Sequence, residues 1–284
     1  MTPSIAAIIP TFNEVELLDA CVTSLTSQGI EQLEIVVVNA GDPLPPDWQS
    51  RVTELKVPSD HFWTACMDAG VQTVRDRADF LLFTNADTTF LPGSVRLLLQ
   101  QALAKPNVIA CSPAYVQVQS QPIELLYSHQ SDLGPLLYGK LVRPWVSLKD
   151  APKVPFAIEL TGGQGVLMPA RLFDRAALDL KNFPHYASDH DLWLQARRLG
   201  FELELVPQAG IVNHRSFNDG GAKNQGSLMR RLWARMSSEY KPESWVLMWR
   251  LRRKHQGPVL GFATALISFG LRWTIGLPKI VKRS

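Results

Sequence analysis

Residues 78–87 read ADFLLFTNAD, an apolar run that ends in the polar turn Asn85-Ala86-Asp87. A short apolar run bounded by turn residues is typical of a strand buried on both faces, as in a parallel sheet covered by helices. Such sheets bind their ligands at the carboxyl ends of the strands. The stretch therefore predicts an α/β protein with a ligand-binding edge at this turn.

The flanking sequence alternates strand-like and helix-like segments. Apolar runs occupy residues 4–10 and 33–40, and apolar residues recur at helical spacing over 14–28. Further helices are expected at 65–77 and at 92–104, where a proline opens the helix. This order predicts a mostly parallel sheet flanked by helices on both faces.

The second half of the chain has weaker periodicity, and no clear element is predicted for residues 121–156. The elements expected there are, in chain order, a strand at 108–119, a Gly-rich turn with a short strand and a helix start at Pro169 within 159–173, a helix at 190–200 closed by Gly200, and two short strands at 201–214.

The composition indicates a globular protein of a reducing compartment. Of 284 residues, 46% are apolar and 19% are charged, which is ordinary for a folded domain. Cys21, Cys66 and Cys111 lie far apart, without a CxxC pair, so neither a disulfide framework nor a zinc site is predicted. The N-terminus lacks the basic and apolar regions of a secretory signal, and we expect the catalytic part to be cytoplasmic.

The charge is strongly divided between two parts of the chain. Residues 1–214 carry 15 Lys and Arg against 23 Asp and Glu, whereas residues 215–284 carry 14 against 3. We therefore predict a domain over 1–214 and a basic, Trp-rich helical tail over 215–284 with an anionic partner. The tail shows no nucleic-acid-binding module, so an anionic membrane surface is favoured over nucleic acid.

The segment 257–277 is about as long as a bilayer core is thick, but it contains Arg272 and four glycines. We expect an interfacial or re-entrant anchor in preference to a full span, peripheral to the inner face of the membrane. A C-terminal helix that packs on the rest of the protein stays open as an alternative.

Polar turns follow several of the predicted strands, and a further acidic segment opens a helix. Taken singly, each has a structural explanation: a helix cap, a tight turn or an exposed acid at a strand end. The four segments are residues 10–14 (PTFNE), 39–42 (NAGD), 85–87 (NAD) and 188–191 (SDHD).

Together with TGGQGVLMPARLF at 161–173, their order and spacing resemble those of the family 2 glycosyltransferases of the GT-A fold. The resemblance covers roughly residues 4–214. It is nearest to bacterial rhamnosyl- and galactosyltransferases of surface polysaccharide synthesis. It implies a GT-A sheet, followed here by a helical tail, and an enzyme that uses a nucleoside-diphosphate sugar.

In this family a divalent cation, Mn²⁺ or Mg²⁺, neutralises the departing diphosphate. The resemblance makes Asp87 its ligand and puts Asn85 where the first acid of the DxD-type turn commonly stands. It also matches His214 to a histidine that completes the metal site in related enzymes. A structural role for this strand-end histidine is the alternative.

Transfer to a hydroxyl needs a general base. The family pattern EDxDL puts that base at Asp189 of SDHDL, with Ser188 in place of the glutamate and Asp191 in the second acidic position. Attack in a single displacement inverts the anomeric configuration. The alternative is that both acids serve only to favour the helix N-terminus, and for Asp191 this structural role is preferred.

The resemblance also assigns binding residues for donor and acceptor. Nucleoside and donor are expected to contact Pro10, Thr11, Asn13, Glu14, Asn39, Asp42, Trp63, Asn85, Ala86 and Asp87, and the acceptor Gly162, Gly163, Gln164 and Asp191. Most relatives carry an aspartate at the position of Asn39, where it accepts a hydrogen bond from the base. An amide can both accept and donate, so UDP, dTDP and GDP all stay open.

The sequence thus predicts an inverting, metal-dependent glycosyltransferase acting on a glycan or lipid-linked acceptor. One alternative is a sugar-phosphate nucleotidyltransferase, although PTFNE lacks the glycines and lysine of a phosphate loop. Another is an inactive relative that acts as an assembly partner, because Asn39 and Asn85 are amides where acids are common.

Overall fold

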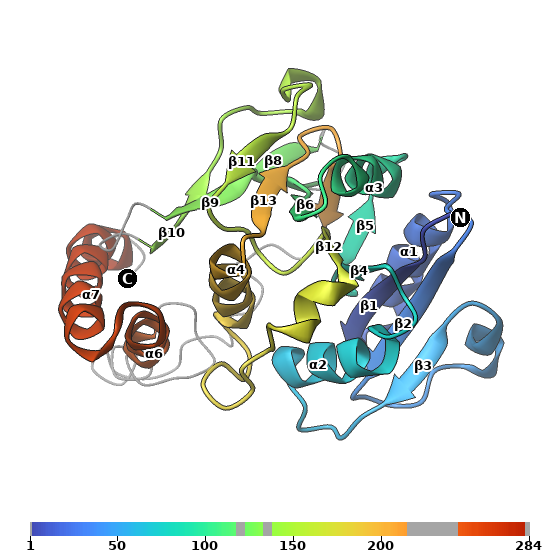
Figure 1. The fold of residues 1–284 in the computed structure, drawn as a ribbon, viewed down its shortest axis with the longest axis horizontal. Coiled ribbons are helices and arrows are strands. Elements are labelled where there is room, and N and C mark those ends of the chain that lie inside the picture. The colour runs from blue at the N-terminus through green and yellow to red at the C-terminus, as the bar shows by residue number, and fades with distance from the viewer. Residues whose placement is uncertain (1, 118–122, 133–137, 215–243, 282–284) are drawn as a thin grey trace.

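A computed structural model describes residues 2–117, 123–132, 138–214 and 244–281. Its centre is an eight-stranded sheet with the strand order β11-β13-β6-β12-β4-β1-β2-β3 (Figure 1). The strands are β1 (Ile5–Thr11), β2 (Leu33–Asn39), β3 (Thr53–Lys56), β4 (Phe80–Phe83), β6 (Val108–Cys111), β11 (Phe156–Ile158), β12 (Val166–Pro169) and β13 (Glu202–Leu205).

The sheet is mixed and mostly parallel. β4, β1, β2 and β3 run parallel to one another, as do β13 and β6, whereas β12 runs antiparallel between β4 and β6. Its inner strands are buried on both faces, as their continuous apolar sequences require. The predicted GT-A-type α/β architecture is confirmed.

Helices cover both faces of the sheet. On one face α1 (Val15–Thr26) and α3 (Ser94–Ala104) form a core with Ile5, Ala7 and Ile9 of β1. On the other, α2 (Trp63–Val74) packs on the intervening residues Ala6 and Ile8, and α4 (Ser188–Arg198) joins the same core next to β13. The alternation of β1 side chains between two cores follows from the two-residue period of a strand.

A second, four-stranded sheet has the order β5-β14-β7-β8. Its strands are β5 (Thr88–Phe90), β7 (Ala114–Val116), β8 (Glu124–Tyr127) and β14 (Ile211–Asn213). The single strand expected over 108–119 is in fact two strands, β6 and β7, which belong to different sheets. Pro113 lies between them and has no N–H for a sheet ladder, which accounts for the break.

Two further features of the second half depart from expectation. The helix expected at Pro169 is a short 3₁₀ helix, Ala170–Asp174. Within 121–156, where no clear element was expected, the structure has β8 and an antiparallel pair, β9 (His129–Asp132) and β10 (Tyr138–Val142). The remaining elements are 3₁₀ helices at Pro46–Ser50 and Leu148–Asp150.

The C-terminal part forms two helices, α6 (Trp245–Gln256) and α7 (Pro258–Val281). Figure 1 shows them side by side at one end of the molecule, next to α4. Leu247 and Leu251 of α6 bury Phe183 from the loop before α4. Within the part of the chain that the structure describes, no helix is long and apolar enough to cross a membrane.

All three cysteines are free and buried, as expected from their spacing. Burial raises the pKa of Cys66 to about 11. It raises the pKa of Cys21 to about 12, with a further contribution from the charge of Asp87. Burial also raises the pKa of Cys111. These thiols are therefore protonated at neutral pH.

Candidate active site

Three polar turns meet at the carboxyl edge of the central sheet. β1 and β2 end in register at Thr11 and Asn39, and the N–H of Ala40 donates to the Thr11 carbonyl at 3.0 Å. The N–H of Thr84, directly after β4, donates to the carbonyl of Ile8 in β1 at 3.3 Å. The fold thus brings the segments 10–14, 39–42 and 85–87 to one edge, as predicted.

The first two turns are locked together by Asn13. Its backbone has φ of 55°, a left-handed conformation that asparagine tolerates better than most residues. Its side-chain Oδ1 accepts the N–H of Asp42 at 2.6 Å. A Cβ on Gly41 would lie 2.2 Å from that same Oδ1, so only glycine fits there. Asn13 and Asp42, both predicted donor-side residues, therefore lie next to each other.

Asn39 is buried and its amide is fully engaged. Nδ2 donates to the Asp42 carbonyl and to Glu54 Oε1, both at 2.7 Å, while Oδ1 accepts the N–H of Gly41 at 2.8 Å. The side chain shapes the turn, as in the structural explanation of this segment. Contacts from Asn39 to a nucleobase would have to replace these bonds.

The acidic turn is held from the side by Trp63, the first residue of α2. The indole Nε1 donates to Asn85 Oδ1 at 2.9 Å, so the predicted donor residues Trp63 and Asn85 are in direct contact. Ala86 is buried and Asp87 is partly exposed. Because Asn85 is an amide, it accepts the indole N–H without placing a second carboxylate beside Asp87.

His214 lies beside Asp87 because β14 pairs with β5, with Asn213 opposite Thr88. The His214 N–H donates to the Asp87 carbonyl at 2.8 Å. The exposed imidazole is 2.9 Å from the Thr89 hydroxyl through Nε2. The backbone thus brings together the two residues expected to hold the metal.

Gln164 connects this turn to the segment that precedes β12. Its Oε1 accepts from the Thr88 hydroxyl and from the Asn213 amide, both at 3.0 Å, and its Nε2 donates to the Tyr127 hydroxyl at 3.1 Å. Val166 of β12 is paired with Phe83 of β4, which places residues 162–164 next to the acidic turn.

Gly163 separates Trp63 from Asp189 at the start of α4. A Cβ added there would meet the Trp63 indole at 2.6 Å and the Asp189 Cβ at 3.4 Å. A Cβ on Gly162 would come to 2.8 Å from the Tyr127 hydroxyl. Any larger residue at Gly163 would push the indole or the helix N-terminus away. The two glycines expected on the acceptor side thus allow this segment to approach α2, α4 and β8 closely.

The charges of Asp87 and Asp189 both act on the buried hydroxyl of Tyr127. Burial raises the pKa of Tyr127 to about 12 and the hydrogen bond from Gln164 opposes this, while the charges of Asp189 and Asp87 raise it further. The charges of the two carboxylates expected to act as base and metal ligand therefore both reach this hydroxyl. Oδ1 of Asp189 also accepts the N–H of His190 at 2.8 Å.

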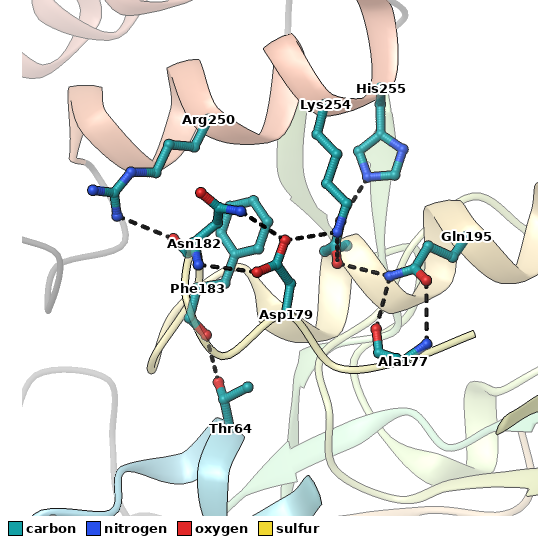
Figure 2. A network of polar contacts seen from close by, with 10 residues as sticks. Thr64, Ala177, Asp179, Asn182, Phe183, Gln195, Arg250, Lys254 and His255 are labelled. Carbon is teal, nitrogen blue, oxygen red and sulfur yellow. Dashed lines mark hydrogen bonds and ion pairs between the residues drawn. The ribbon is translucent and has the colours of Figure 1, made fainter. Parts of the chain in front are cut away.

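Asp191 is placed differently from the expected acceptor-side contact. It is fully buried, and its carboxylate accepts from Lys254 Nζ at 2.9 Å, His255 Nε2 at 2.7 Å and Gln195 Nε2 at 2.8 Å. Lys254 also contacts Asp179 at 2.8 Å (Figure 2). Asp191 thus joins α4 to α6, a contact that differs from the helix-dipole role preferred for it from sequence.

The structure adds residues that the sequence did not single out. Tyr127, Thr88 and Asn213 complete the network around Gln164. His185 lies in the loop before α4, where burial lowers its pKa and the charge of Asp189 acts in the opposite direction. The position of Thr88 directly after the acidic turn could have indicated it, whereas a lone Tyr127 in an irregular region carries no such signal.

A family model described as glycosyl transferase family 2 matches residues 6–150. This chain belongs to the family 2 glycosyltransferases. The matched residues include the first three turns of the site. Identification as a family 2 glycosyltransferase of GT-A fold is confirmed, whereas the resemblance to rhamnosyl- and galactosyltransferases stays a prediction.

Solved structures that match this glycosyltransferase include the crystal structure of GalNAc-T7 with UDP, GalNAc and Mn²⁺. The TM-score is 0.64 at 14% identity, over 97% of this chain. The chain spans 57% of the length of that one. At this identity the likeness shows the shared fold. No curated protein matches the sequence.

Proposed function

We propose that this glycosyltransferase moves a sugar from a nucleoside-diphosphate donor to a hydroxyl of a glycan or lipid-linked acceptor, with inversion. The observation that carries the proposal is that the segment before β12 adjoins both carboxylates. A Cβ on Gly163 would lie 3.4 Å from the Asp189 Cβ, and Gln164 accepts a hydrogen bond from Thr88, which follows Asp87. One carboxylate stands at the donor turn and the other at the N-terminus of α4. This arrangement suits a donor sugar between them.

In this proposal Asp189 is the general base. The acceptor oxygen attacks the anomeric carbon as the bond to the diphosphate oxygen breaks, and Asp189 takes the hydroxyl proton. One such displacement inverts the anomeric centre. Asp189 is partly exposed and lies in the first turn of α4. His185 is held neutral by burial and leaves Asp189 without a fixed cationic partner among the described residues.

Asp87 and His214 would hold the Mn²⁺ or Mg²⁺ ion. Among the described residues no three acidic, His or Cys side chains gather as a metal site, so the protein would supply only part of the coordination. This fits a cation shared with a diphosphate, because Mg²⁺ is commonly bound by one or two carboxylates plus substrate phosphates. When bound, the cation would neutralise charge on the leaving diphosphate. The presence of UDP and Mn²⁺ in GalNAc-T7 supports this assignment.

The nucleoside would lie over the turns at 10–14 and 39–42. Because the amide of Asn39 is engaged within its turn, we propose that backbone groups and the side chains of Asn13, Glu14 and Asp42 contact it. Pro10 and Thr11, the last two residues of β1, would lie at the base of this nucleoside site. The candidate nucleotides of the donor are UDP, dTDP and GDP.

We also propose that the protein is cytoplasmic and binds the inner face of the membrane through its tail. The support is the basic sequence of α6 together with the exposed apolar side chains of α7. A lipid-linked acceptor, as in surface polysaccharide synthesis, would be presented at that surface. Nucleic acid is not a proposed partner. The boundary at residue 214 is part of this proposal.

Two variants test the roles of the two carboxylates, and each is the control for the other. We expect Asp87→Ala to lose Mn²⁺-dependent stabilisation by UDP, dTDP or GDP in thermal-shift measurements, together with transfer. We expect Asp189→Asn to keep that stabilisation but to lose transfer by about 10²–10⁴-fold. Asparagine can still accept the N–H of His190.

Metal-dependent turnover by the Asp87→Ala protein would contradict the metal assignment. An Asp189→Asn protein that transfers sugar at the original rate would contradict the assignment of the base. If no nucleotide raises the melting temperature of the unaltered protein with either metal, the donor class itself is wrong.

A further inference from the structure

A cavity of about 390 Å³ lies between α4 and α6, away from the donor turn. Its polar lining is almost entirely cationic. The residues that matter here are Arg197, Arg198, Arg252, His255 and Gln256, with Leu251 on one wall. No acidic side chain lines it among the described residues. The cavity therefore suits an anion, and its volume exceeds that of a single inorganic ion.

His255 is a second, independent indication of an anionic ligand. The side chain is 6% exposed, and Nε2 is engaged by Asp191. The other ring nitrogen, Nδ1, is buried without a hydrogen-bond partner in the described structure. A buried polar atom of this kind costs free energy unless a ligand or water satisfies it. An anionic oxygen in the cavity would accept a hydrogen bond from Nδ1–H of His255.

The cavity opens next to an apolar surface. Its last lining residue, Gln256, precedes α7 by two positions, and Gln256 Oε1 accepts from the Thr264 hydroxyl of α7 at 2.6 Å. Large side chains along α7 are exposed to solvent: Val259, Leu260, Phe262, Leu266 and Ile267. Such a face beside a cationic cavity is complementary to a molecule with an anionic head and hydrocarbon chains.

We propose that this cavity binds the phosphate of an anionic phospholipid headgroup, with the acyl chains against the exposed face of α7. Arg197 is exposed and would meet the headgroup first, whereas buried Arg252 and His255 would contact the phosphate at the base of the cavity. The inference rests on the membrane association in the proposed function, but it does not depend on glycosyl transfer.

The test compares two arginines that carry the same charge. Arg197→Gln removes a cavity residue, whereas Arg253→Gln removes a charge of α6 that stacks on Trp249, outside the cavity lining. Binding is measured by co-sedimentation with vesicles of phosphatidylcholine alone or mixed with phosphatidylglycerol. Loss of one surface charge weakens binding by about fivefold, corresponding to ~1 kcal/mol. We expect this loss for Arg253→Gln and a loss above about tenfold for Arg197→Gln.

Equal losses for the two variants would overturn the proposal, since only net charge would then matter. Displacement of the protein from mixed vesicles by inorganic phosphate at matched ionic strength would indicate a free-anion site and would also overturn it. Tighter binding to vesicles carrying a polyprenyl diphosphate than to phosphatidylglycerol at equal charge would assign the cavity to the acceptor lipid instead.

The double variant Arg197→Gln/Arg198→Gln provides a second measurement, and we expect it to lose its preference for phosphatidylglycerol. Nucleotide binding in these variants monitors the fold. The Asp87→Ala protein should bind mixed vesicles normally, so a failed donor assignment and a failed headgroup site give different results.

Discussion

The structure accounts for the amide of Asn39, at a position where the family resemblance implies an acid. Its Nδ2 donates to the carboxylate of Glu54 and to the carbonyl of Asp42. An aspartate there would lose both donors and face Glu54 with a like charge. The amide at this position is a consequence of the neighbouring strand β3, and it gives no support to an inactive protein.

We expect Asn39→Asp to lower the free energy of unfolding by about 1–3 kcal/mol, because it leaves buried acceptors unsatisfied and sets two carboxylates together. Urea titration followed by circular dichroism measures this change. Adding Glu54→Gln should restore much of the loss, since glutamine can donate to the new carboxylate. A double variant no more stable than the single one would show that Glu54 is not the cause.

At the scale of elements, α6 holds the loop that leads into α4. Lys254 bridges Asp179 and Asp191, Arg250 donates to the Asn182 carbonyl at 3.2 Å, and Thr64 of α2 donates to the Phe183 carbonyl at 2.6 Å (Figure 2). Thr64 follows Trp63, which binds Asn85. The loop is thus fixed between α6 and the donor side of the site.

We expect Lys254→Met to destabilise the protein by about 2–3 kcal/mol. Removing one partner of a buried ion pair typically costs more, but the Lys254 side chain is a third exposed and its charge is partly screened by water. Lys181→Met, on an exposed residue of the same loop, is the control and should change stability by less than about 0.5 kcal/mol. Equal unfolding midpoints for the two variants would contradict the assigned contact.

The same contact predicts a pH dependence. Burial alone would raise the pKa of Asp179, but hydrogen bonds from Lys254 and Asn182 hold it below its usual value. Burial acts to lower the pKa of Lys254, and the two carboxylates raise it above its usual value. The stabilisation by this ion pair is therefore complete between about pH 5 and pH 9. It is lost at low pH, as the pH falls through the depressed pKa of Asp179. It is also lost at high pH, as the pH rises through the raised pKa of Lys254.

The difference in unfolding free energy between the unaltered protein and Lys254→Met should follow that profile. A difference that varies between pH 5 and pH 9 would point to another titrating group.

Sequence patterns predicted the long elements and the acidic turns because these are local properties. They did not predict β5, whose three residues are too few for a period to be visible, nor its pairing with β14. That pairing places His214 beside Asp87. Likewise, the SDHDL segment was recognised, but the partners of Asp191 come from a helix more than sixty residues later.

On the scale of the whole molecule, α6 lies beyond the proposed domain boundary at residue 214 and packs against the loop before α4. α6 contributes charges and Leu247 and Leu251 to the loop before α4, whereas α7 contacts mainly α6. The two C-terminal helices therefore have different expected roles: α6 stabilises the fold and lines the proposed headgroup cavity, whereas α7 meets the acyl chains of the membrane. Residues 215–243 lie outside the described part of the chain.

Two truncations separate these roles. A chain ending at Gly257 should stay folded, bind donor nucleotide and transfer sugar to a soluble acceptor, but bind anionic vesicles much more weakly, because the headgroup cavity is kept and the apolar face of α7 is lost. A chain ending at residue 244 should be less stable by at least about 3 kcal/mol, because it also exposes Phe183 and leaves Asp191 without cationic partners. Equal unfolding free energies for the two would show that α6 is an independent unit.

The three buried cysteines have a practical consequence for measuring how α7 meets a bilayer. Maleimides react with thiolates, and thiols with pKa values of about 11 and 12 are almost wholly protonated at neutral pH. The folded protein therefore has little background labelling, and a single exposed cysteine made by Phe262→Cys would carry a spin label or fluorophore selectively. Quenching of that probe by lipid-bound quenchers would report the depth of α7 directly, in an otherwise unaltered chain.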